Sequence, residues 1–134
     1  MDSEQAPSTE MPPSEVQIAA WTQGLYLTNI TVLPVVSFVI LMWLYSKKFA
    51  TCHPVTQLHF KQSILANIVA GILLIIVSAL ILLFGSFNSP YTWMVLLIYF
   101  ICIHSALILY GVFALIKALA QEKYIYPVFG NWWR

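Results

Sequence analysis

The chain has 134 residues, of which 60% are hydrophobic and only 8% are charged. A soluble domain usually carries about 25% charged residues, so this composition excludes an ordinary water-soluble protein. The net charge of +1 gives no general attraction to nucleic acid. We therefore expect a membrane protein whose main contacts are lipids, and an all-α one, because a backbone in lipid must satisfy its own hydrogen bonds.

The composition divides the chain into three parts. Residues 1–15 hold four of the five acidic residues and three of the seven prolines, which predicts a flexible acidic tail. Residues 16–118 are predicted to form one helical membrane domain. Residues 119–134 carry five aromatic side chains around Lys123 and Arg134, so we expect this tail to lie in the headgroup layer.

The uncharged run from Val16 to Ser46 is too long for one straight span and too short for two spans with a loop. We expect an interfacial helix from about Ser14, leading into a first span over roughly Leu25–Tyr45 that kinks near Pro34. In the alternative, Val16–Pro34 dips into the membrane and returns as two half-spans, which puts the N-terminus inside. Whether residues 16–34 span, lie on or re-enter the membrane stays open.

The run from Ser63 to Phe84 contains neither a charge nor a proline. At about 1.5 Å per residue, its helix matches the ~30 Å hydrocarbon core of a bilayer. A third span is predicted from about Thr92 to Ala118. The short loop 85–92 between these spans predicts an antiparallel hairpin, so the whole chain should have three transmembrane helices.

With three spans, all six basic residues fall on one side of the membrane, and the positive-inside rule places that side in the cytoplasm. They are Lys47, Lys48, Lys61, Lys117, Lys123 and Arg134. The N-terminus is then outside and the C-terminus cytoplasmic.

Two short motifs flank the predicted hairpin. His59-Phe60-Lys61-Gln62 precedes the second span, and Ile116-Lys117-Ala118 with Glu122, Tyr124, Tyr126 and Pro127 follows the third. Together they resemble a bacterial family of small multi-span membrane proteins of unknown function, itself distantly similar to the channel subunit of the chloroplast inner-envelope import translocon. The likeness covers roughly residues 16–129, although Ser63 replaces a usual alanine and Gln121 a usual glycine. The resemblance implies a bacterial inner-membrane location and a shared structural role, such as a bond between the two motifs.

His104 lies near the centre of the third span, where ionisable groups face the protein interior and often mark a functional site. A neutral histidine bonded to a neighbouring helix is one interpretation; an ion, proton, metal or haem site is another. In an antiparallel hairpin, His104 should lie at the depth of Leu74 or Ile75.

The second span carries small and weakly polar residues at intervals of four and seven, which places them on one helix face. They are His59, Ser63, Asn67, Gly71 and Ser78. Such faces allow close helix packing in lipid, and a transport path is the alternative. His59, Lys61 and Gln62 could also bind a lipid phosphate or an acidic loop, or simply anchor the helix.

No nucleophile with a poised base and no zinc-like Cys/His spacing is present, so we expect neither catalysis nor a bound cofactor. Our first functional hypothesis is a non-enzymatic accessory subunit of a larger inner-membrane complex. It would pack through the His59–Ser78 face and the aromatic tail, including Trp132 and Trp133. Two alternatives are an oligomeric conducting element similar to the translocon, and a subunit that supplies His104 to a metal or haem.

Overall fold

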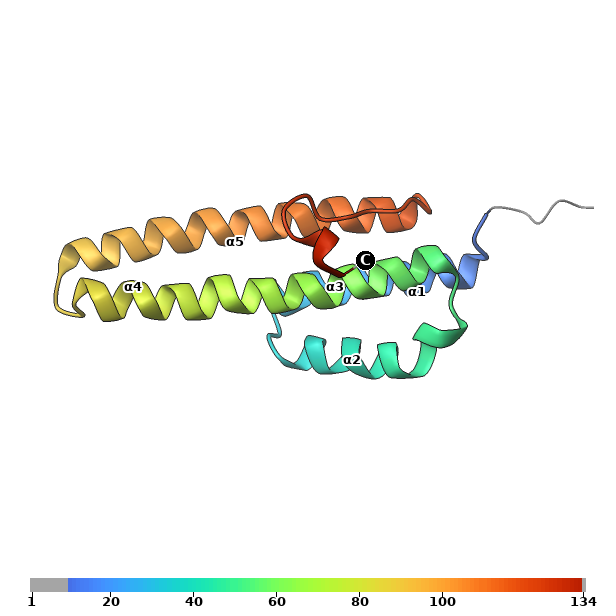
Figure 1. The fold of residues 1–134 in the computed structure, drawn as a ribbon, viewed down its shortest axis with the longest axis horizontal. Coiled ribbons are helices and arrows are strands. Elements are labelled where there is room, and N and C mark those ends of the chain that lie inside the picture. Colours follow the sequence, from blue (N-terminus) through green and yellow to red (C-terminus); the bar gives the residue numbers. More distant parts are fainter. Residues whose placement is uncertain (1–9, 134) are drawn as a thin grey trace, which may run out of the picture.

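The structure is a computed structural model, and it describes residues 10–133 (Figure 1). Residues 1–9, most of the predicted acidic tail, and Arg134 lie outside the described part. Within it, the chain forms helices and no β-strand. The elements are α1 (Pro13–Thr31), α2 (Val36–Lys48), the 3₁₀ turn η1 (Phe49–Thr51), α3 (Pro54–Gly71), the π-helical segment η2 (Ile72–Val77), α4 (Ser78–Gly85), α5 (Pro90–Leu119) and the 3₁₀ turn η3 (Gly130–Trp133).

The predicted hairpin is confirmed. α3, η2 and α4 form one continuous helical run from Pro54 to Gly85, and α5 packs along it in the opposite direction (Figure 1). Each helix begins with a proline, whose missing N–H is not needed in the first turn. Both helices are long and apolar enough to cross a membrane, and only 11% of the most apolar stretch of each is buried inside the molecule. A core helix of a soluble protein would be mostly buried.

The prediction of one kinked span over Leu25–Tyr45 is wrong. α1 ends at Thr31, the chain reverses direction over residues 32–35, and α2 returns beside α1 (Figure 1). With 19 and 13 residues, these two helices reach only about 28 and 20 Å at 1.5 Å per residue. The chain does reverse, as in the alternative, but not within Val16–Pro34: that segment is mostly the single helix α1, and the returning helix is α2.

The reversal has a local physical cause. Pro34 has no N–H to donate and disfavours helical geometry at the residue before it, so α1 cannot continue. Val35 then takes a positive φ of 71° with ψ −51°, and the N–H of Val36 donates to the Pro34 oxygen at 2.9 Å. This is a strained γ-turn. The Asn29 side chain holds it, because its Oδ1 accepts from the Val35 N–H at 2.9 Å.

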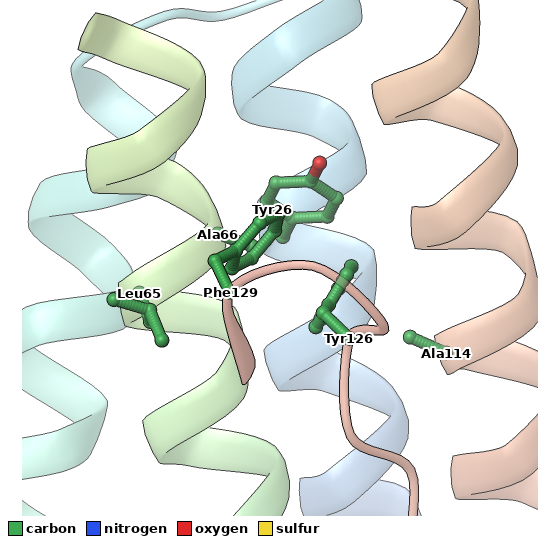
Figure 2. Packing of buried hydrophobic residues seen from close by; sticks show 6 residues of the cluster. All are labelled: Tyr26, Leu65, Ala66, Ala114, Tyr126 and Phe129. Carbon is green, nitrogen blue, oxygen red and sulfur yellow. The ribbon is translucent and has the colours of Figure 1, made fainter. Parts of the chain in front are cut away.

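α1 lies between α3 and α5 and supplies the centre of the core. Gly111 of α5 allows this close approach, because a Cβ there would lie 2.5 Å from the Tyr26 ring. Tyr26 is fully buried, and its hydroxyl donates to the Leu107 oxygen at 3.0 Å. Figure 2 shows it beside side chains from α3, α5 and the C-terminal segment: Leu65, Ala66, Ala114, Tyr126 and Phe129.

One end of the molecule, here called the lysine end, gathers the start of α1 and α3 and the ends of α2 and α5 (Figure 1). It carries Lys47, Lys48, Lys61, Lys117 and Lys123. The start of α1 is bonded there: the Met11 N–H donates to Gln121 Oε1 at 2.8 Å, and Glu15 Oε2 accepts from the His53 N–H at 3.2 Å. We expected the two ends of the chain to lie on opposite sides of the membrane. For the described residues 10–133 this expectation is wrong, because the start of α1 and the end of α5 lie together at the lysine end. Two half-length helices, rather than one span, bring the chain back to its starting side.

The C-terminal segment, residues 121–133, folds back over the helices (Figure 1). Tyr126 is fully buried and Phe129 is 5% exposed, whereas Trp132 is 75% exposed. The predicted aromatic tail is thus part of the core on one side and presents apolar surface on the other.

Candidate functional site

A polar cluster lies inside the lysine half of the molecule. It consists of Gln23 from α1, His59 and Gln62 from α3, and Tyr126 from the C-terminal segment, and all four residues are fully buried. Gln23 connects three of them: its Nε2 donates to His59 Nδ1 at 3.1 Å, and its Oε1 accepts from the Tyr126 hydroxyl at 3.3 Å. Buried polar groups that are paired in this way hold the surrounding elements in one arrangement.

The hydrogen bonds of His59 define its tautomer. Nε2 lies 2.9 Å from the main-chain oxygen of Glu122, and a carbonyl oxygen can only accept. Nε2 therefore carries the proton, and Nδ1 accepts from the Gln23 amide. The ring is neutral and both nitrogens are occupied, so His59 serves to join α1, α3 and the C-terminal segment.

Gln62 fixes the same segment at two further points. Its Nε2 donates to the Gly130 oxygen at 2.8 Å, and its Oε1 accepts from the Tyr126 N–H at 3.2 Å. A Cβ at Gly130 would come within 2.5 Å of that Oε1 atom, so the close approach requires glycine. The bond expected between the entrance motif at 59–62 and the exit motif at 122–126 is confirmed.

A second site lies near the middle of the long hairpin, beside the α1–α2 turn. Neither α1 nor α2 covers the hairpin beyond this turn (Figure 1). Two cavities of about 430 and 250 Å³ share Asn29, Pro34, Asn67, Gly71 and Ile75 as lining residues. One extends to Phe38 of α2, and the other extends to Phe100 and His104 of α5. We call this combined space the notch. Its wall is almost wholly apolar, and its polar lining includes a hydrogen bond from Asn29 Nδ2 to Asn67 Oδ1 at 2.7 Å.

His104 lines the notch together with Leu74 and Ile75, which confirms its predicted depth. Its ring stacks on Phe100 at 5.4 Å between centroids. Nδ1 is buried and has no hydrogen-bond partner among the described residues, and the same holds for Ser78 Oγ and Ser63 Oγ. The interpretation of His104 as a histidine bonded to a neighbouring helix therefore finds no such bond at Nδ1 in the described part.

The long helix changes its geometry beside His104. Residues 72–77 form a π-helical segment, in which the regular α-helical hydrogen bonding is interrupted. The Tyr99 hydroxyl donates to the Leu73 oxygen at 2.6 Å, so α5 satisfies a carbonyl of this segment. Unsatisfied carbonyls are costly in lipid, and this bond is consistent with a helix that lies there.

The predicted packing face is divided between the two sites. His59, Ser63 and Asn67 are buried, and α1 packs against the helix that carries them. Gly71 is open, with no atom within 4 Å of an added Cβ. We expected a partner to use this whole face. Instead, α1 of the same chain covers the half of the face nearest the lysine end.

The remaining predicted residues surround the polar cluster. Lys117 forms an ion pair with Glu122, and Lys61 lies over the Phe49 ring at 5.8 Å. Tyr124 packs edge-on against Tyr126, and Pro127 is exposed. The side chain of Trp133 lies outside the described part.

Sequence reasoning missed three residues of these sites, Gln23, Tyr26 and Asn29. The partners of Gln23 and Asn29 are His59 and Asn67, which lie 36 and 38 positions away, and no local pattern signals such pairings.

Among residues 10–133, no three His, Cys, Asp or Glu side chains gather closely enough to hold a metal ion. Comparison of the sequence with family models and curated proteins, and of the fold with solved structures, gave no match.

Proposed function

We propose that this chain is a non-enzymatic accessory subunit of a bacterial inner-membrane complex, and that a partner helix packs into the notch. In this arrangement the two long helices cross the bilayer and the lysine end faces the cytoplasm, because cytoplasmic loops carry the excess of lysine and arginine. α1 and α2 enter from that side and turn back near the middle of the bilayer. Both ends of the described chain are then cytoplasmic.

The polar cluster supports a structural role over a chemical one. Its hydrogen bonds join parts of the same chain, and its histidine has both ring nitrogens occupied. A group that transfers a proton or binds a ligand needs a free position directed at that ligand.

The observation that carries the proposal is that α1 does not cover the whole packing face. At Gly71, beyond the part that α1 covers, this face lines the notch. Gly71 is a small residue of the kind that favours close helix contact, and no atom lies within 4 Å of a Cβ added there. His104 also lines the notch, and its Nδ1 has no hydrogen-bond partner among the described residues. A partner helix with a hydroxyl, amide or carboxyl group at this depth would bring that group beside the His104 ring.

Two glycines provide a matched test. Gly71→Leu fills the notch, and Gly24→Leu adds the same side chain to α1; both positions have open space around them. A tagged chain purified in mild detergent should bring down a stoichiometric partner. We expect Gly71→Leu to lose that partner and Gly24→Leu to keep it, while both variants elute at the same size as the wild-type chain alone.

Retention of the partner by Gly71→Leu would move the interface away from the notch. Purification of the wild-type chain as a monomer without any partner would contradict the accessory role itself.

A further inference from the structure

We propose that the chain is a membrane wedge that favours bilayers in which the leaflet around its lysine end lies on the convex side. This inference goes beyond the accessory role and needs no partner. It depends on how much of the chain lies at each depth of the bilayer.

The depth of each helix follows from the shared lining of the notch. Ile30 and Pro34, at the α1–α2 turn, line it together with His104, which lies at the middle of α5 (Pro90–Leu119). α1 and α2 therefore accompany the long hairpin over its lysine half only. Of the described residues 10–133, the other half of the molecule contains only the end of η2, α4 and the first part of α5 (Figure 1).

The exposed surface of α2 places that helix in lipid. Its outward side chains include Val36, Val39, Ile40 and Trp43, which are 45–60% exposed, and its first charge is Lys47 near the end. The turn itself presents Val32, Leu33 and Val35, each at least half exposed. Such a surface is stable in the hydrocarbon layer, and its lysines can reach the headgroups.

The consequence is a large difference in cross-section. Four helices and the C-terminal segment occupy the lysine half, and two helices occupy the other. With helix diameters of about 10–12 Å, the two extra helices add roughly 200 Å² to one leaflet. A bilayer relieves this mismatch by curving, so that the leaflet with the larger protein area becomes the outer one.

This preference belongs to the chain without its partner. A helix bound in the notch adds area to the narrow half and reduces the difference, so the test uses the purified chain at low density in lipid.

The experiment uses giant vesicles of phosphatidylethanolamine and phosphatidylglycerol, from which narrow tubes are pulled outward. The full-length chain carries a polar dye on a cysteine introduced by Ser46→Cys, an exposed position at the lysine end. Cys52 is buried and Cys102 lies on the lipid-facing surface of α5, so neither should compete for the dye. An impermeant quencher then separates molecules whose lysine end faces outward from those that face inward.

We expect outward-facing molecules to be enriched at least about twofold on the tubes, relative to a lipid dye, and inward-facing molecules to be depleted. The two orientations are controls for each other in the same vesicle. Equal density on tube and vesicle for both orientations would overturn the proposal. Enrichment of both orientations alike would also overturn it, because a wedge responds to the sign of curvature.

Discussion

The Nε2 atom of His59 donates a hydrogen bond to the main-chain oxygen of Glu122, 2.9 Å away and 63 positions further along the chain. This bond joins the start of the long hairpin to the segment that follows its end. With the two bonds of Gln62, it makes the C-terminal segment a structural part of the helical domain.

Gln62→Leu should release the C-terminal segment. Leucine has a similar size, but it leaves the Gly130 oxygen and the Tyr126 N–H without partners. Each unsatisfied buried group costs about 1–3 kcal/mol, so we expect a loss of roughly 2–4 kcal/mol in the free energy of unfolding in detergent. The rate of tryptic cleavage after Lys123, an exposed residue of the segment, should rise as well.

Gln17→Leu is the matched control, because Gln17 is exposed on α1. Its cleavage rate should equal that of the wild-type chain. Equal rates for both variants would mean that Gln62 does not hold the segment.

Gly111→Ala should separate α1 from α5. The new Cβ would lie 2.5 Å from the Tyr26 ring and 2.6 Å from Leu27 Cδ2, and Tyr26 cannot shift without weakening its bond to the Leu107 oxygen. Overpacking of this kind typically costs about 1–3 kcal/mol. Thermal unfolding in detergent measures the loss.

The same substitution at Gly24, which has open space around it, removes a flexible residue from α1. We expect Gly24→Ala to be neutral or more stable by up to about 1 kcal/mol. A Gly111→Ala variant as stable as Gly24→Ala would contradict the close packing of α1 on α5.

Val35→Gly should stabilise the protein. A β-branched residue at a φ of 71° is strained, and such strain costs of order 1–3 kcal/mol, which glycine avoids. The Val35 side chain is 70% exposed, so its removal sacrifices little packing. We expect a gain of about 1 kcal/mol in the free energy of unfolding.

Val36→Gly tests the neighbouring position, which lies at the first residue of α2. That change should destabilise by about 0.5–1 kcal/mol, because glycine weakens a helix. A loss at both positions would argue against the γ-turn.

Alkaline pH should loosen the C-terminal segment. Burial, with smaller contributions from Tyr26 and Tyr124, raises the pKa of Tyr126 well above the value of 10 that the unfolded chain has. The native state therefore holds this proton more tightly. The corresponding stability is complete below pH 10 and is lost as the pH rises above it.

Tyrosinate absorbance measures this effect. Subtraction of the Tyr126→Phe titration from that of the wild-type chain should leave a component that titrates above pH 10. Over the same pH range, tryptic cleavage of the wild-type chain after Lys123 should become faster. A component at or below pH 10 would place Tyr126 in contact with water.

The parts of the fold that depend on local chemistry could be predicted. Prolines 54 and 90 begin the two long helices, and the short loop between them dictates an antiparallel hairpin. The depth of His104 followed from that geometry. The contact between the two motifs was an expectation from the resemblance, and it is geometrically possible because both motifs flank the hairpin on one side.

The reversal after α1 could not be predicted, because Pro34 is compatible with either a kink or a turn. The deciding feature is the positive φ of Val35, a conformation that valine disfavours, and the Val35 N–H donates to Asn29 Oδ1. Asn29 in turn donates to Asn67 of α3, so a tertiary contact overrides local preference there. The same holds for Gln23, whose role depends on His59 and Tyr126, far along the chain.

The order of synthesis gives the C-terminal segment a further importance. Residues 122–130 leave the ribosome after every long helix has been made, yet they satisfy the polar side chains near the start of α3. Until then, His59 and Gln62 lack their final partners at the edge of the membrane. The helical domain is therefore completed by a local closure of about ten residues, and a premature stop before Tyr126 would leave four complete helices with an open polar interior.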